Sequence, residues 1–396
     1  MGLAHDMNGT RERIGIRYIV VAVAAAQTAG FAGWTGSPII VGALIDELGM
    51  TAAAAGVMVT AELAALAVAT WLSAGLLARR SRKVIGLTGA GVALAGHALS
   101  VLAPGFTALL AARLVAGLGE GVALAAGNAV AAGSRHPHQV FARVTAVVVL
   151  GIALQLFALP YVTTPFGPAG GYAALAALTL IVSPAFIWLA PPPERSNVYD
   201  DHRLPHPALG LLGVVSIALI AIGQGAVWTF TERIAAAAGI SAEGAGRVLG
   251  GGTLLGIAGA SLAIWLGTRQ GRTAPITLGT CVGIAAILIL VNVPTTGAFT
   301  GAAVVWIFVY WFSQPYFFGA LAALDNRGRW AASGGGTQIA GTAIGPAVGG
   351  LLVSTASYTA LGGLAAVIGL LGLAAIFPVV RFADRHASAA VPPSAP

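Results

Sequence analysis

The sequence carries very little charge for its length. Only 8% of its 396 residues are Asp, Glu, Lys or Arg, whereas soluble domains carry about 25%. It has one cysteine, Cys281, which excludes an intramolecular disulfide and a cysteine metal cluster. No Gly-Lys-Ser or Gly-Lys-Thr phosphate loop follows any of its glycine strings, which disfavours an ATP-driven protein. Water is therefore not expected to be the main solvent of this chain.

Hydrophobic residues make up 57% of the chain. They gather in runs longer than about 18 residues, which is the length of a membrane-spanning helix. The runs do not alternate as the strands of a membrane barrel do, so they predict an all-α integral membrane protein with twelve transmembrane helices. In chain order the predicted spans are 16–43, 52–78, 84–103, 105–132, 140–164, 168–190, 208–231, 244–267, 275–293, 297–324, 332–354 and 357–380.

The basic residues lie mostly in the short segments between these spans. With a cytoplasmic N-terminus, all of the 20 Lys and Arg residues except Arg113, Arg233 and Arg247 fall on the cytoplasmic side. Because cytoplasmic loops are rich in Lys and Arg, we expect both termini on the cytoplasmic side of a bacterial inner (plasma) membrane. Small scattered basic groups are not the continuous patch that nucleic acid requires, so no nucleic-acid partner is expected.

One long polar segment divides the chain. We predict an N-terminal six-helix half at 1–190, a cytoplasmic linker at 191–207, a C-terminal six-helix half at 208–385 and a flexible tail at 386–396. The halves carry similar motifs about 190 residues apart, and parallel repeats of this kind build many transporters. We therefore expect the two halves to surround a central cavity.

The repeated motifs lie at corresponding places in the two halves. Span 1 contains a Gln-Thr-Ala-Gly-Phe-Ala-Gly-Trp segment that begins at Gln27, and span 7 contains Gln-Gly-Ala-Val-Trp beginning at Gln224. The loops after spans 2 and 8 contain Arg79-Arg-Ser-Arg82 and Arg269-Gln-Gly-Arg272.

These motifs resemble signatures of the major facilitator superfamily over nearly the whole chain. The loop arginines match its loop signature, although the aspartate that precedes them is absent from both copies. Span 4 carries the Arg-x-x-x-Gly signature as Arg113-Leu-Val-Ala-Gly117, and span 11 carries Gly341-Thr-Ala-Ile-Gly345-Pro346-Ala-Val-Gly349-Gly350. The resemblance implies a twelve-helix secondary transporter of the drug or organic-solute:proton antiporter type, in which these glycines, Pro346 and the loop arginines serve packing and gating. The span 11 string belongs to span 5 in the family's exporters, and its presence favours efflux.

Three ionisable residues lie at middle depths of the predicted spans, namely Glu62 in span 2 and Arg113 and Glu120 in span 4. A charge at the bilayer centre costs at least about 2.5–3.5 kcal/mol, so such residues have partners or functions. Arg113 and Glu120 share a helix face two turns apart, too far for direct pairing, so Glu62 is the expected partner of Arg113. We expect one acid to exchange a proton under the influence of Arg113; the alternative is a fixed buried ion pair. His97 in span 3 is interpreted as a hydrogen-bonded packing residue.

Polar and aromatic side chains within the spans are candidates for solute binding. Span 10 has a central aromatic run around Pro315, which favours an aromatic or amphipathic solute, with plain helix packing as the alternative. The candidate solute-binding residues are Gln27, Trp34, Asn128, Gln224, Trp228, Tyr310, Trp311, Gln314 and Gln338.

Taken together, these features favour a proton-coupled secondary transporter that exports a small organic solute and works as a monomer in the lipid bilayer, without metal or cofactor. Uptake of an organic anion attracted by Arg113, by symport or uniport, is the alternative. A membrane sensor descended from a transporter is the alternative of another class. An enzyme is not expected, because the spans contain no His, Asp and Ser constellation at membrane depth.

Overall fold

The computed structural model describes residues 2–134, 137–189, 204–269, 271–325 and 328–389. The described residues form helices joined by short turns and no strand. In lipid every backbone N–H and C=O must be satisfied within the protein, and an apolar helix does this by itself. The prediction of an all-α membrane protein is confirmed.

The chain divides into two compact units. The first comprises Met1–Leu48 and Ala61–Asn197, and the second comprises Gly49–Thr60 and Val198–Pro396. Helix α2 (Ala52–Leu77) therefore contributes its beginning to the second unit and its remainder to the first. The predicted linker lies mostly outside the described residues, which end at 189 and resume at 204.

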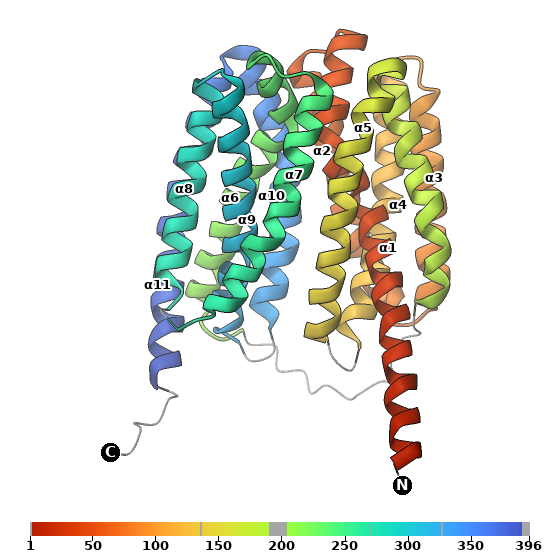
Figure 1. Cartoon of the computed structure of the whole chain (residues 1–396), viewed down its shortest axis with the longest axis vertical. Coiled ribbons are helices and arrows are strands. Elements are labelled where there is room, and N and C mark those ends of the chain that lie inside the picture. Colours follow the sequence, from red (N-terminus) through yellow and green to blue (C-terminus); the bar gives the residue numbers. More distant parts are fainter. Residues whose placement is uncertain (1, 135–136, 190–203, 270, 326–327, 390–396) are drawn as a thin grey trace. The chain divides into compact units, whose positions relative to one another are not determined.

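The first unit is built from α1 (Gly2–Leu48), most of α2, α3 (Arg82–Val101), α4 (Phe106–Ala132), α5 (Pro137–Val182) and the short 3-10 helix η1 (Ser183–Trp188). Helix α1 packs against α4 and α5, and α3 packs against α4. Figure 1 shows these helices side by side. Alanine and valine side chains of α1, α4 and α5 form much of the core.

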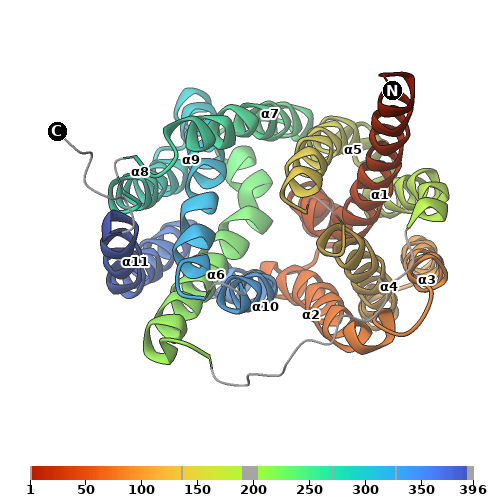
Figure 2. The ribbon, with the colours of Figure 1, turned by 90° about the horizontal axis from the view of Figure 1, so that it is seen from below.

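The second unit contains the beginning of α2 together with α6 (Pro207–Ala237), α7 (Ala242–Leu266), α8 (Thr273–Asn292), α9 (Thr296–Ala322), α10 (Arg329–Thr355) and α11 (Tyr358–Ala389). Helix α6 packs against α10 and α11, while α9 packs against α7 and α8. The end-on view in Figure 2 shows this arrangement. Helix α11 continues to Ala389, into the segment predicted as a flexible tail, and residues 390–396 lie outside the described part.

Helix α5 contains two of the twelve predicted spans. Eleven helices in the described part of the chain are long and apolar enough to cross a membrane, because predicted spans 140–164 and 168–190 fall into one continuous helical stretch. The backbone leaves helical geometry only at Gly167, with φ 58° and ψ −156°. Glycine reaches that conformation without a Cβ clash, and the chain turns back there (Figure 1). The predicted boundary between the two spans is thus a one-residue turn.

Serine and threonine side chains fix the starts of several helices. Ser81 accepts from the Val84 amide at the start of α3, and Ser241 and Thr295 cap α7 and α9 in the same way. Each cap satisfies one of the free N–H groups at a helix start.

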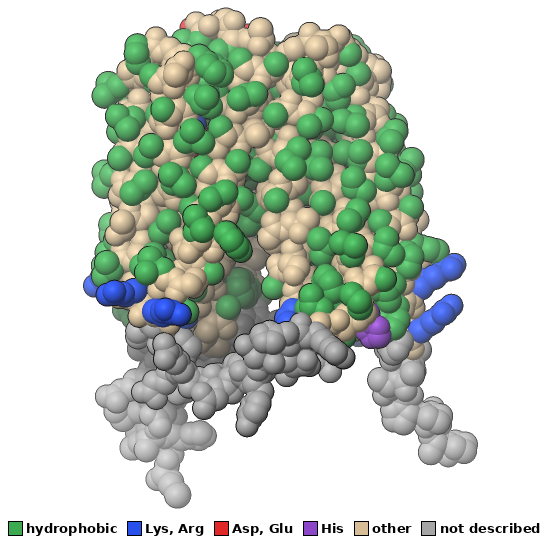
Figure 3. Space-filling view, turned by 180° about the vertical axis from the view of Figure 1, so that it is seen from behind, with side chains coloured by type: hydrophobic (Ala, Val, Ile, Leu, Met, Phe, Trp, Pro, Cys, Tyr) green, Lys and Arg blue, Asp and Glu red, His purple; other side chains and the backbone are tan. Residues whose placement is uncertain are grey.

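Large apolar side chains cover the outward faces of the helices. Trp71, Ile264 and Trp265 are 78%, 75% and 70% exposed. Figure 3 shows hydrophobic side chains over most of one face, with Lys and Arg side chains at one end of the helices. Such extensive apolar exposure suits lipid rather than water, and with the helix lengths it identifies a multi-pass membrane protein.

Candidate functional site

Small residues bring α2, α3 and α4 close together in the first unit. A Cβ atom at Gly96 of α3 would overlap the backbone of Ala116 in α4, and one at Gly117 of α4 would overlap the backbone oxygen of Glu62 in α2. Small residues allow membrane helices to approach closely enough for polar side chains to meet. Gly117 thus lies where α4 meets α2.

Arg113 lies at the centre of the resulting cluster and is 1% exposed. Its Nη1 donates to Glu62 Oε1 at 2.8 Å, and its Nε donates to Ser100 Oγ at 3.0 Å. Its Nη2 lies 3.0 Å from His97 Nδ1, and its guanidinium carbon lies 4.5 Å from the centre of the Tyr172 ring. The structure brings Glu62 and Arg113 together as the sequence predicted, and all three guanidinium nitrogens have a partner.

Glu120 is also 1% exposed and lies beside this ion pair. Its carboxyl group has longer polar contacts than that of Glu62. Its Oε1 accepts a 3.3 Å hydrogen bond from the Gly33 amide of α1 and lies 3.5 Å from His97 Nε2. Its Oε2 has no hydrogen-bond partner among the described residues.

The charges of the cluster do not balance unless it holds a proton. Glu62 and Glu120 together carry two negative charges when ionised, and Arg113 supplies one positive charge. His97 adds none, because Arg113 can only donate and His97 Nδ1 must therefore accept, which assigns the ring proton to Nε2. Uncompensated buried charge is costly. One proton on the carboxyl pair makes the cluster neutral, so its charge state can change by a single proton.

The candidate solute-binding residues of the first unit lie on α1 and α4. Gln27 Nε2 donates to Asn128 Oδ1 at 2.9 Å, which joins the two helices. Trp34 is half-buried and follows Gly33, the residue whose amide contacts Glu120. The predicted polar residues therefore occupy the same pair of helices as part of the charged cluster.

The remaining solute candidates lie in the second unit. Gln224 and Trp228 are half-buried one turn apart on α6, and the Trp228 ring centre lies 6.2 Å from that of Trp306 on α9. The indole N–H of Trp306 is buried without a hydrogen-bond partner in the described part of the chain.

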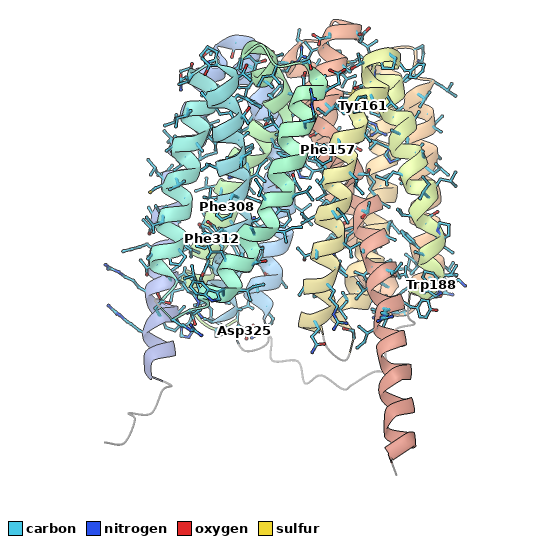
Figure 4. The ribbon with its side chains drawn as sticks, viewed as in Figure 1. Phe157, Tyr161, Trp188, Phe308, Phe312 and Asp325 are labelled. Atoms are coloured by element: carbon cyan, nitrogen blue, oxygen red, sulfur yellow. The ribbon has the colours of Figure 1, made fainter. Side chains whose placement is uncertain are left out.

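Tyr310 lies near two of the other predicted residues on α9 and α10. Its hydroxyl accepts a 3.4 Å hydrogen bond from Gln338 Nε2, and the half-buried Gln314 follows one turn later on α9. Trp311 points elsewhere, because its ring occupies the space next to Gly256 of α7. Phe308 and Phe312 lie one turn apart on α9 (Figure 4). Tyr310 and Gln338 thus form a polar contact between α9 and α10, while Trp311 packs against α7.

The glycine-rich string of α10 packs against α6. Cβ atoms at Gly341, Gly345 and Gly349 would lie closer than van der Waals contact to α6 backbone atoms. The distances are 2.7 Å from Ala218 O, 2.6 Å from Ala226 N and 3.1 Å from Ala226 Cα, respectively. Pro346 interrupts the hydrogen-bond ladder of α10, and the following Ala347 amide donates instead to Thr60 Oγ1 of α2 at 2.9 Å.

The predicted loop arginines differ in their surroundings. Arg79 and Arg269 are exposed, whereas Arg82 is 8% exposed and its Nε has no partner among the described residues. Arg272 binds Asp384 of α11 through its backbone amide at 2.9 Å and its Nη1 at 3.0 Å. The acidic partner missing from the loop motif of the second half is thus supplied by a distant helix.

Sequence reasoning missed Ser100 and Tyr172 as members of the cluster and assigned His97 to packing alone. Ser100 and His97 are one turn apart on α3, and this spacing in an apolar span was the available signal. Nothing local in the sequence indicated that the Tyr172 ring lies against Arg113. In the described residues no group of three or more His, Cys, Asp or Glu side chains is arranged to hold a metal ion.

The chain is similar to known proteins in sequence pattern and in fold. The model of the family described as Major Facilitator Superfamily matches residues 23–325, and no curated protein matches the chain. A bacterial homologue of the human lysosomal transporter Spinster, in an inward-facing and unoccupied conformation, is 15% identical with a TM-score of 0.66 over 96% of this chain and 99% of that one.

Two other solved structures have a similar fold. The nucleoside transporter NupG is 14% identical, with a TM-score of 0.70 over 92% of this chain and 98% of its own. The peptide transporter POT, in complex with sulfate, is 15% identical, with a TM-score of 0.70 over 93% of this chain and 95% of its own. At these identities the likeness concerns the fold alone.

Proposed function

We propose a function from the premise that this chain belongs to the major facilitator superfamily and is a membrane transporter rather than an enzyme. The proposed function is proton-coupled transport of a small organic solute. The observation that carries it is the buried pair of acids with a single guanidinium, whose charge balances only when one proton is bound. Ionisable residues inside membrane spans are functional by default, and here the imbalance points to a proton as the coupling ion.

Glu120 is the proposed proton carrier, with Glu62 as its partner. The 2.8 Å ion pair with Arg113 holds Glu62, whereas Glu120 has only the Gly33 amide at 3.3 Å and an imidazole at 3.5 Å. The less compensated carboxylate gains most from a proton. Transport then requires the proton to leave Glu120 on one side of the membrane and return on the other.

The arrangement of Arg113 favours this role over capture of an organic anion. Its three nitrogens are already bound to Glu62, Ser100 and His97, and its flat face is covered by Tyr172. An anionic solute would have to displace at least one of these partners from a site that is 1% exposed. Proton coupling needs no such rearrangement.

The solute is proposed to be aromatic or amphipathic. The support is the set of half-buried Trp228, Tyr310 and Gln338 beside the buried Trp306 N–H, which together offer ring faces and hydrogen-bonding groups. Mostly apolar walls with few polar groups are typical of small-molecule sites. Efflux is the proposed direction, supported by the likeness of the α10 glycine string to the exporter signature.

We also propose that the protein works as a monomer in a bacterial inner membrane with both termini in the cytoplasm. The support for the proposed orientation is the position of the basic residues, which cluster at one end of the helices (Figure 3). Cytoplasmic ends of membrane helices are enriched in Lys and Arg.

The experiment uses the full-length protein in vesicles that contain a pH-sensitive dye. Aromatic and amphipathic solutes that quench its tryptophan fluorescence are added, and proton movement is recorded for the wild type, Glu62→Gln, Glu120→Gln and Glu47→Gln. The exposed Glu47 is the matched control for the charge change. We expect solute-driven proton movement in the wild type and in Glu47→Gln, and its loss in Glu120→Gln. Solute flux without proton movement in the wild type would contradict proton coupling.

A further inference from the structure

His97 has surroundings that the packing interpretation does not explain. It is fully buried on α3, with Nδ1 bound to Arg113 Nη2 at 3.0 Å and Nε2 facing Glu120 Oε1 at 3.5 Å. Nε2 makes no hydrogen bond to any described residue. A buried donor without a partner costs free energy, so its position beside the proposed proton carrier calls for a reason.

The helix seam fixes the ring in this position. Next to His97, Gly96 lies so close to α4 that a Cβ there would overlap Ala116. The Arg113 hydrogen bond to Nδ1 then holds the neutral tautomer whose proton is on Nε2. The N–H group therefore points at Glu120 in a ring that is already oriented.

Charged and polar groups reach the cluster around the ring from four other helices. Helix α4 presents Arg113 and Glu120, α2 presents Glu62 through its pair with Arg113, α5 presents Tyr172 against Arg113, and α1 presents the Gly33 amide to Glu120. Among the described residues, the His97 Nε2–H group is a buried donor that faces Glu120 and makes no hydrogen bond.

We propose that His97 is a positioning residue for proton release, which donates its Nε2–H to the Glu120 carboxylate formed when the proton leaves for water. While Glu120 is protonated, His97 Nε2 lies 3.5 Å from Glu120 Oε1. When Glu120 is ionised, the two atoms move to hydrogen-bonding distance, and the hydrogen bond offsets part of the negative charge of the carboxylate. His97 itself neither gains nor loses a proton in the step. This inference rests on the proposed function, because it assigns a task to His97 only if Glu120 carries the proton.

Two substitutions of His97 test the roles of Nδ1 and Nε2 separately. The amide of Asn reaches the position of Nδ1, so His97→Asn can keep an acceptor for Arg113 but loses the donor for Glu120. The longer Gln reaches the position of Nε2, so His97→Gln keeps the donor for Glu120 but loses the acceptor. A purely structural role predicts similar effects of both, whereas the proposed role predicts a difference.

The test measures proton-coupled transport of the full-length protein in vesicles across a pH series. His97→Gln is expected to keep the wild-type pH midpoint. His97→Asn is expected to shift the midpoint toward alkaline pH by about one unit, because a hydrogen bond to a charged group is lost. Infrared titration of the protonated carboxyl band, assigned with Glu120→Gln, should shift in parallel.

The outcomes distinguish the inference from the function on which it rests. If Glu120→Gln abolishes coupling but His97→Asn and His97→Gln share the same pH midpoint, the role of His97 is wrong and proton coupling stands. If the wild type moves solute without protons, both are wrong. Should His97→Asn fail to accumulate, His97→Gln decides, since an alkaline shift in that variant contradicts the inference and a wild-type midpoint supports it.

Discussion

Gly33 stands directly against the carboxyl group of Glu62, so that a Cβ atom at this position would overlap Oε1 and lie 2.7 Å from Cδ. Helix α1 can approach the charged cluster only because this residue has no side chain. The same residue donates its amide to Glu120. Gly33 therefore limits the space available to the Glu62 carboxyl group and also donates a hydrogen bond to that of Glu120.

Gly33→Ala is expected to displace the Glu62 carboxyl group and weaken its ion pair with Arg113. Overpacking of a buried site costs about 1–3 kcal/mol, and proton-coupled transport should fall while the protein still folds. Transport in vesicles and thermal unfolding in detergent would measure the two effects. Gly75→Ala in α2 is the matched control, because a Cβ there meets nothing within 4 Å; equal transport by the two variants would contradict the steric account.

Removal of the guanidinium should destabilise the protein more than removal of the whole ion pair. Arg113→Gln leaves two buried acids without a cation, and breaking a buried pair costs about 3–5 kcal/mol. The double variant Arg113→Gln/Glu62→Gln removes one acid as well and should recover part of the loss. Thermal unfolding of the two variants tests this order, and a double variant less stable than the single one would count against the charge balance described for the cluster.

We expect the Thr60 hydroxyl to stabilise the protein, because it accepts the hydrogen bond of the Ala347 amide that follows Pro346. Thr60→Val removes the acceptor of the Ala347 amide and leaves a partly buried donor unsatisfied, which costs up to about 1–3 kcal/mol. Thr60→Ser keeps the hydroxyl and should remain close to the wild type. Amide hydrogen exchange at Ala347 provides the measurement, and equal protection in the Val and Ser variants would show that the hydrogen bond contributes nothing.

Much of the fold was predictable because each span has to satisfy its own backbone in lipid. Apolar runs of about 20 residues therefore mark the helices directly. The boundary between predicted spans 5 and 6 corresponds to the turn at Gly167, although the helical geometry resumes so quickly that the two spans form one element. Depth along a helix is also readable from sequence, which is why Glu62 was expected to meet Arg113.

The rest of the site depends on which way each helix faces, and a single sequence does not reveal this. His97 and Ser100 contact Arg113 only because the small residues of α3 and α4 set the rotation and distance of the two helices. Tyr172 reaches the guanidinium from the returning part of α5. Asp384 approaches Arg272 from α11, far along the chain, so no local motif could indicate it.

The most direct test of the account compares two kinds of transport by Glu120→Gln. Exchange of labelled for unlabelled solute moves no net proton, whereas accumulation driven by a pH gradient requires the proton to bind and leave. With a solute found in the vesicle screen, the account predicts that Glu120→Gln exchanges solute at a rate near that of the wild type but does not accumulate it against a gradient. Accumulation by the variant equal to that of the wild type would contradict the claim that this buried acid couples protons to transport.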